Sequence, residues 1–130
     1  MRVPSPLSPL TEALLTRVIG CAVAVHRELG PGLLEGVYRR AMGVELRTQG
    51  IPFETEKAIF VHYRGVALPG QRIDLLVDNQ LIVELKAVKQ FDPVHLAQAL
   101  SYLKATGLRA GLLINFHRKL LKHGLRRVVL

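Results

Sequence analysis

Two acidic residues and one lysine interrupt runs of apolar residues in the middle of the chain. Glu84 and Lys86 lie in segment 82–86, and Asp74 lies ten positions before Glu84 in segment 72–77. If 82–86 is a β-strand, Glu84 and Lys86 point to the same face, because side chains alternate along a strand. Such a pair either faces solvent or forms part of a chemical site.

The turn between the two segments decides whether Asp74 and Glu84 meet. A two-residue turn at 79–80 puts Asp74 opposite Leu85, whereas a three-residue turn at 78–80 puts Asp74 opposite Glu84. The second register also gathers the apolar side chains of both strands on one face. These side chains are Ile73, Leu75, Val77, Leu81, Val83 and Leu85. Burial and chemistry therefore favour the same register, in which the two carboxyl groups are neighbours.

A close pair of carboxylates requires compensation. At about 4 Å apart, two carboxylates repel by roughly 4 kcal/mol at an effective dielectric constant near 20. A divalent cation or a raised pKa relieves this repulsion. Mg²⁺ and Mn²⁺ prefer oxygen ligands, polarise a phosphodiester and lower the pKa of a bound water. Lys86 could then stabilise an attacking hydroxide or the charge that develops on the phosphate.

The elements that must position these residues follow from the hydrophobic periodicity and the turn residues. The predicted order is helix, helix, three strands, helix, strand, with a short C-terminal strand at the edge. Arg64-Gly65 and Pro69-Gly70 punctuate the first strand connection. The strands on either side of the third helix should be parallel, as in a crossover unit. The expected helices are 10–29, 34–49 and 93–105, and the expected strands are 53–63, 71–77, 81–88, 111–116 and 125–130.

Length and composition limit the class of protein. The chain has 130 residues, 49% of them hydrophobic, which predicts a single domain at 10–130 after a flexible, proline-containing segment at 1–9. A net charge of +8 favours an anionic partner, most commonly nucleic acid. One cysteine, Cys21, lies in an apolar run, so we expect a reducing, cytoplasmic location. The apolar stretch 18–25 is shorter than the ~20 residues that a membrane span needs.

Two motifs resemble those of the PD-(D/E)XK nuclease superfamily, in its branch of small proteins called GxxExxY. Residues 32–38, GLLEGVY, match the motif that names the branch, and Asp74 with Glu84-Leu85-Lys86 matches the nuclease signature in the same order. The resemblance covers about residues 10–127. It implies an α/β fold with a restriction-endonuclease-like core, in which helices flank a mixed β-sheet. Ile73 replaces the proline often found before the aspartate. This proline carries no catalytic group, so its absence matters little.

The resemblance also implies roles for individual residues. Asp74 and Glu84 would be ligands of Mg²⁺ or Mn²⁺, Lys86 the catalytic lysine, and Glu35 a further metal ligand from the N-terminal helices. An acidic residue in the first turn of a helix is also favoured by the helix dipole, so Glu35 alone indicates no function.

A third element extends the resemblance to the helix expected at 93–105. Gln98 and Tyr102 look like the QxxxY element that follows the signature in RecB-type nucleases, which would place them in the catalytic site. Their spacing puts both beside the buried stripe of the helix, where such a pair can either satisfy the edge of the core or hold a phosphate.

Two functions follow from these observations. The first is a metal-dependent nuclease that hydrolyses phosphodiester bonds in nucleic acid, with DNA favoured over RNA. The second is a nucleic-acid-binding module of the same fold that cleaves little by itself. A chain this short leaves little room for a specificity domain, so a homodimer or a protein partner would then select the substrate.

Overall fold

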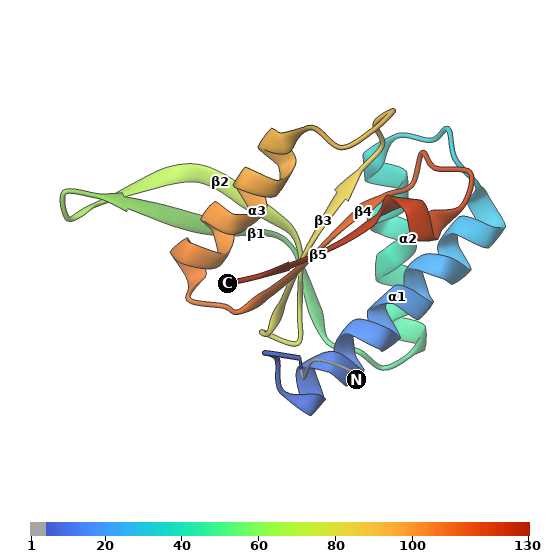
Figure 1. The fold of residues 1–130 in the computed structure, drawn as a ribbon, viewed down its shortest axis with the longest axis horizontal. Helices are drawn as coiled ribbons and strands as arrows, with labels where there is room; N and C mark the ends of the chain where they lie inside the picture. Colours follow the sequence, from blue (N-terminus) through green and yellow to red (C-terminus); the bar gives the residue numbers. More distant parts are fainter. Residues whose placement is uncertain (1–4) are drawn as a thin grey trace.

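The structure, a computed structural model, describes residues 5–130 as a five-stranded sheet covered by helices on both faces (Figure 1). The sheet order is β1-β2-β3-β4-β5, with β3 and β4 parallel and the other neighbours antiparallel. The strands are β1 Phe53–Tyr63, β2 Val66–Val77, β3 Leu81–Lys86, β4 Ala110–Asn115 and β5 Leu125–Val129. A short 3₁₀ helix, η1 Leu121–Gly124, precedes β5. The predicted order of elements and the parallel β3–β4 pair are confirmed.

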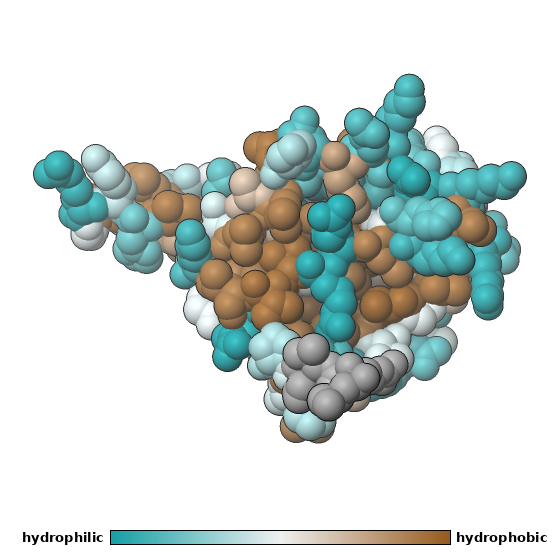
Figure 2. All heavy atoms as spheres, in the orientation of Figure 1, coloured by the Kyte–Doolittle hydropathy of each residue, from teal (hydrophilic) through white to brown (hydrophobic). Residues whose placement is uncertain are grey.

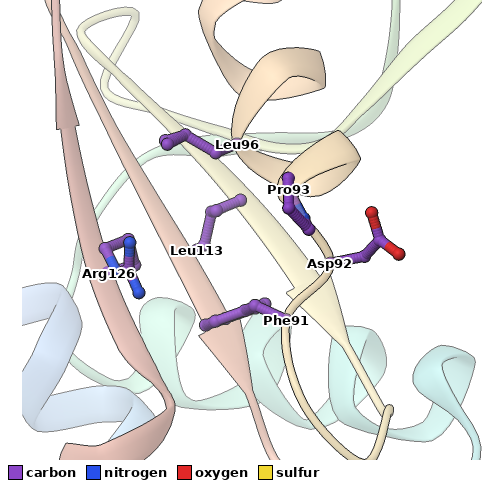
Figure 3. Close-up of a pocket in the computed structure, with 6 residues that line it drawn as sticks. All are labelled: Phe91, Asp92, Pro93, Leu96, Leu113 and Arg126. Atoms are coloured by element: carbon purple, nitrogen blue, oxygen red, sulfur yellow. The ribbon is translucent and has the colours of Figure 1, made fainter.

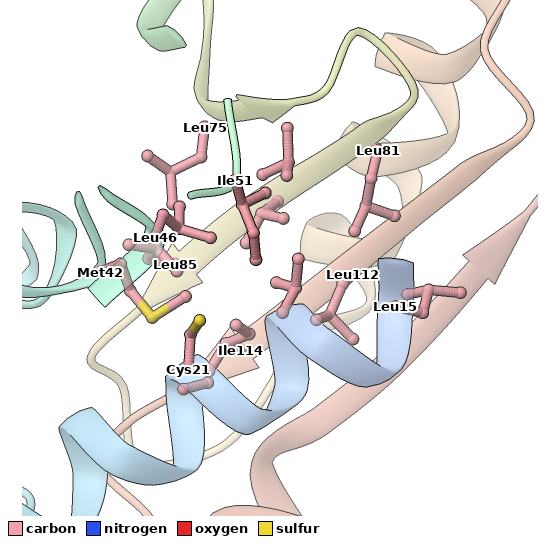
Figure 4. Close-up of a cluster of buried hydrophobic side chains, with 14 of the residues drawn as sticks. Leu15, Cys21, Met42, Leu46, Ile51, Leu75, Leu81, Leu85, Leu112 and Ile114 are labelled. Carbon is pink, nitrogen blue, oxygen red and sulfur yellow. The ribbon is translucent and has the colours of Figure 1, made fainter. Parts of the chain in front are cut away.

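Helices α1 (Pro9–Leu29) and α2 (Glu35–Thr48) cover one face of the sheet (Figure 4). By length and composition α1 could cross a membrane, with a mean hydropathy of 1.2 over its most apolar window. Six of its side chains, however, are buried in a cluster with α2 and the sheet. They are Leu14, Leu15, Val18, Cys21, Ala22 and Val25. Packing in this larger cluster therefore accounts for the apolar stripe of α1.

Helix α3 (Pro93–Thr106) covers the opposite face alone, over a smaller cluster that includes Ile82, Leu103 and Leu113. The Asp92 side chain accepts a hydrogen bond from the Val94 N–H, and His95 Nδ1 accepts one from the Asp92 N–H. These two bonds form a capping box, which begins the helix at Pro93. The capped start holds α3 directly after the loop that leaves β3.

The predicted register of β2 and β3 is confirmed, because Val77 pairs with Leu81 and Leu75 with Val83. Asp78 and Asn79 both have positive φ values, 51° and 53°, within the three-residue turn. These residue types tolerate that conformation better than others do. The turn chemistry and the burial pattern thus specify the same pairing.

One residue departs from the expected faces. Ile73 packs in the smaller cluster under α3 rather than beside Leu75, so the prediction of a single apolar face was wrong for this residue. Strand β1 pairs Lys57 with Ile73 but leaves Glu56 unpaired opposite Asp74, and Glu56 has a φ of 48°. The alternation of side chains along β2 is therefore interrupted next to Asp74, opposite this positive-φ residue.

The β1–β2 hairpin projects beyond the rest of the domain (Figure 1), and residues 61–70 are all exposed. Arg64 and Gly65 form its two-residue turn with φ values of 49° and 79°, which matches the twist of a hairpin. Pro69-Gly70, expected in the connection, instead lies inside β2. The pairing shifts there, between Ile59 with Gln71 and Val61 with Leu68, and this bulge accommodates a proline that cannot donate a hydrogen bond.

The segment predicted as flexible falls partly outside the described residues, which exclude residues 1–4. Of the rest, Leu7 is buried in the larger cluster. The Ser8 side chain accepts a hydrogen bond from the Thr11 N–H and caps α1. Leu7 and Ser8, within the segment predicted as flexible, therefore have defined partners in the structure.

Candidate active site

Asp74 on β2 and Glu84 on β3 meet where the backbone pairing of these strands ends. The last residues paired are Leu75 and Val83. Beyond them, the Asp74 N–H donates to Glu84 Oε1 at 3.1 Å, and the Leu85 N–H donates to Asp74 Oδ2 at 2.8 Å. Each carboxyl group thus binds a backbone N–H of the opposite strand, and these bonds keep the two groups side by side.

Glu84 is the charged side chain most deeply buried within residues 5–130, at 3% exposure. Burial raises its pKa from 4.5 to about 8, and the charge of Asp74 adds to this rise. The Asp74 N–H and the Lys86 ammonium act in the opposite direction. Without a cation, Glu84 therefore keeps its proton at neutral pH, because desolvation and a like charge both oppose ionisation.

Lys86 lies two residues along β3 from Glu84, and α3 supplies its hydrogen-bond partner. Its Nζ donates to Gln98 Oε1 at 3.4 Å, and both side chains are half-buried. The structure therefore brings together four of the predicted residues: Asp74, Glu84, Lys86 and Gln98.

Tyr102 lies one turn after Gln98 on α3 and is buried. Burial raises its pKa, with smaller contributions from Glu84 and Asp74. Its hydroxyl donates to Gln71 Oε1 at 2.7 Å. This bond ties α3 to β2 close to the site.

Glu35, at the first turn of α2, reaches the same end of β3 from the other side. Its Oε1 accepts a hydrogen bond from the Ala87 N–H at 3.3 Å. Across residues 5–130, no three His, Cys, Asp or Glu side chains lie close enough together to hold a metal ion. Ligation by Glu35 thus stays a prediction.

Other residues of the 32–38 motif have structural roles. The Tyr38 hydroxyl donates to the Gly30 carbonyl at 2.5 Å and accepts from the Leu33 N–H at 3.2 Å. Its ring stacks on Phe116, with centroids 4.4 Å apart. Gly32 has a φ of 110°, a conformation that side chains rarely adopt. The motif therefore fixes the loop that presents Glu35 to β3.

Asn115 was missed as a site residue by reasoning from the sequence. It is 1% exposed, and its amide binds Val88 twice: Nδ2 donates to the carbonyl at 2.7 Å, and Oδ1 accepts from the N–H at 3.2 Å. Its backbone pairs with Lys86. Asn115 therefore holds the loop that follows Lys86. The available signal was a single amide at the end of an apolar strand.

The carboxyl pair has the donor chemistry that a hard divalent cation requires. Each group uses one oxygen for a backbone N–H, which leaves Asp74 Oδ1 and Glu84 Oε2 for the partner carboxyl or for a cation. A cation there would offset both the like charge and the desolvation that raise the pKa of Glu84. Two carboxylates suit Mg²⁺, which usually keeps several of its waters.

A mixed sheet with an aspartate on one strand and a Glu-x-Lys run on the next defines a class of α/β nuclease-like proteins. Residues 12–128 match the sequence profile of the PD-(D/E)XK nuclease superfamily. The chain belongs to this superfamily, and its helices and mixed open sheet agree with a restriction-endonuclease-like fold. Members of the superfamily generally use divalent metals, usually Mg²⁺. No curated protein matches the chain.

Proposed function

We propose that this protein is a metal-dependent nuclease of the GxxExxY branch, which hydrolyses phosphodiester bonds in nucleic acid. The pairing of Asp74 with Glu84 carries the proposal: each carboxyl group binds a backbone N–H of the opposite strand, and the charge of Asp74 acts on Glu84. An acidic pair whose Glu84 is buried is unfavourable for stability without a cation. Its presence beside a lysine, where the β2–β3 pairing ends, is best explained by binding chemistry. Membership of the nuclease superfamily supports the same conclusion.

Each residue has a distinct role in this proposal. Asp74 and Glu84 hold a divalent cation, Mg²⁺ or Mn²⁺. When bound, this cation supplies Lewis acidity toward a phosphoryl oxygen and lowers the pKa of water. The Lys86 ammonium donates to a phosphate oxygen and stabilises the negative charge that develops there. Gln98 positions Lys86 through the bond to Nζ.

Glu35 is proposed as an additional ligand from α2. Its carboxylate lies at the Ala87 N–H, directly after Lys86. Rotation of this exposed side chain away from the Ala87 N–H would free its carboxylate for a cation or one of the waters of that cation.

The charge of the chain supports nucleic acid as the substrate. The net charge is +8, and exposed cations lie on the C-terminal segment, including Lys119, Lys122 and Arg126. Contacts of such side chains with phosphates are independent of sequence and weaken with salt. We propose DNA over RNA.

The direct test is cleavage of single- and double-stranded DNA and RNA by the purified chain with Mg²⁺, with Mn²⁺ and with a chelator. We expect metal-dependent cleavage, and Lys86→Ala should lower its rate by about 100-fold or more, as for other groups that stabilise transition-state charge. Lys89→Ala is the matched control, because Lys89 is an exposed lysine three residues away in the loop. Circular dichroism checks that both variants fold. Equal activity of Lys86→Ala and the wild type would mean contamination and would contradict the proposal.

A further inference from the structure

A pocket lies beside the carboxyl pair on the face of the sheet that α3 covers. Asp74 on β2 lies on one side of Glu84. On the other side, Glu84 pairs with Leu113 on β4, and Leu113 pairs with Arg126 on β5. Neighbouring strands are about 4.8 Å apart, so Arg126 begins about 10 Å from Glu84. Two carboxyl groups, one leucine and one arginine thus form a row across four strands.

Four apolar residues, one cation and one acidic residue line this pocket (Figure 3). Leu113 forms the floor, Phe91, Pro93 and Leu96 form the walls, and Arg126 stands at the β5 side. The pocket has a volume of about 220 Å³. In the orientation of Figure 2, hydrophobic surface extends through the region between α3 and β5. The pocket therefore suits a small, flat, apolar group that is attached to an anion.

The acidic residue at the rim does not oppose an anionic ligand. The Asp92 carboxylate points away from Arg126 in Figure 3 and accepts the hydrogen bond of the Val94 N–H at 2.9 Å. Within residues 5–130, Arg126 forms no salt bridge with any carboxylate. Its guanidinium is available to a ligand.

We propose that this pocket binds one unpaired nucleobase of the substrate, next to the phosphate that lies at Asp74 and Glu84. The base stacks on Phe91 against Leu113, and Arg126 binds an adjoining phosphate. The inference rests on the proposed function and adds a substrate class to it. Because a base that is still paired cannot enter a pocket of this size, the preferred substrate is a single strand or an unpaired end.

The test measures binding without cleavage. Fluorescence anisotropy with a labelled single-stranded DNA oligonucleotide, the same sequence as RNA, and the corresponding blunt duplex is recorded in a chelator, which stops metal-dependent hydrolysis. Phe91→Ala should weaken binding of the single strands about tenfold, within the range for loss of one stacked base, and should leave duplex binding unchanged. Arg126→Ala should reduce the slope of log affinity against log salt concentration by about 0.7 for single strands.

Matched controls separate this pocket from general effects. Val94→Ala alters an exposed side chain of α3 that does not line the pocket, and Arg27→Ala removes an exposed arginine of α1, on the other side of the sheet. Both should bind like the wild type. Phe91→Leu keeps apolar volume but loses the aromatic face, so it should resemble Phe91→Ala if stacking carries the binding.

An abasic position moved along the oligonucleotide gives the decisive comparison. At one position, the abasic site should weaken binding by the wild type about tenfold. It should leave binding by Phe91→Ala unchanged, because the abasic site and the substitution remove the same contact. Independent losses from the two changes would overturn the inference. So would equal weakening of single strands and duplex, or no weakening of either. Cleavage is assayed separately: the expected binding pattern without cleavage would refute only the nuclease, whereas cleavage without this pattern would refute only the pocket.

Discussion

The two faces of the sheet are built for different tasks. The face under α1 and α2 is a continuous apolar cluster that joins both helices to β2, β3 and β4. The face under α3 has a smaller cluster, and it also carries Glu84, Lys86 and Gln98. Along β3, neighbouring residues serve opposite faces: Val83 and Leu85 pack in the larger cluster, while Glu84 and Lys86 form the site. Side-chain alternation therefore separates stability from chemistry within one strand.

The largest expected effect contrasts two neighbouring leucines of β4. Leu112 packs in the larger cluster and Leu113 in the smaller one, and each is 1% exposed. Leu112→Ala should lower the free energy of unfolding by about 3–5 kcal/mol, because the enclosed cavity cannot collapse. Leu113→Ala should cost about 2–3 kcal/mol, since its cavity opens into the adjoining pocket.

Urea denaturation of both variants and the wild type, followed by circular dichroism, measures the difference. Equal losses would mean that the α3 face contributes as much stability as the other face. The division of tasks between the faces would then be wrong.

A second prediction concerns how the buried Glu84 carboxyl group makes the free energy of unfolding depend on pH. The pKa of Glu84 is raised to about 8 in the folded chain, so between pH 4.5 and 8 the folded state binds more protons than the unfolded state. The contribution of Glu84 to the free energy of unfolding is therefore largest below pH 4.5 and decreases as pH rises toward 8. The slope is at most about 1.4 kcal/mol per pH unit. Glu84→Gln should remove this component.

Chemical denaturation in a chelator at several pH values tests this pH dependence. The difference between the wild type and Glu84→Gln is the quantity to follow, because the contributions of the five histidines cancel in it. Adding Mg²⁺ at pH 8 should stabilise the wild type more than the variant. A wild type whose stability is independent of pH in this window, relative to Glu84→Gln, would mean that the acid is not desolvated.

Much of this arrangement could be predicted from the sequence because it depends on local patterns. The apolar alternation and the 78–80 turn specify the pairing of β2 with β3, which brings Asp74 to Glu84. The β3–α3–β4 crossover follows from two apolar strands around a proline-initiated, glycine-terminated helix. Both features rest on side-chain period and turn chemistry alone.

The features that could not be predicted depend on contacts distant in sequence. Ile73 lies on the face under α3, and Glu56 on the neighbouring strand has a positive φ that its residue type does not signal. Asn115 is a site residue only because β4 lies beside β3 and its amide meets the loop at Val88. Likewise, the hydrogen bond of Gln71 with the Tyr102 hydroxyl depends on the position of α3 over the sheet, which the sequence around Gln71 does not indicate.

The smallest expected effect distinguishes the two members of the 98–102 pair. Tyr102→Phe removes a hydroxyl whose partner, Gln71, is exposed, so water can replace it. The free energy of unfolding should fall by about 1 kcal/mol or less, and cleavage should stay near the wild-type rate. Gln98→Ala should instead lower the rate, because it frees Lys86 Nζ from the position that the site requires. Cleavage rates and urea denaturation of both variants measure this difference. If Tyr102→Phe abolished cleavage at unchanged stability, the hydroxyl would act on the substrate, and chemistry would extend further along α3 than the contacts with Lys86 indicate.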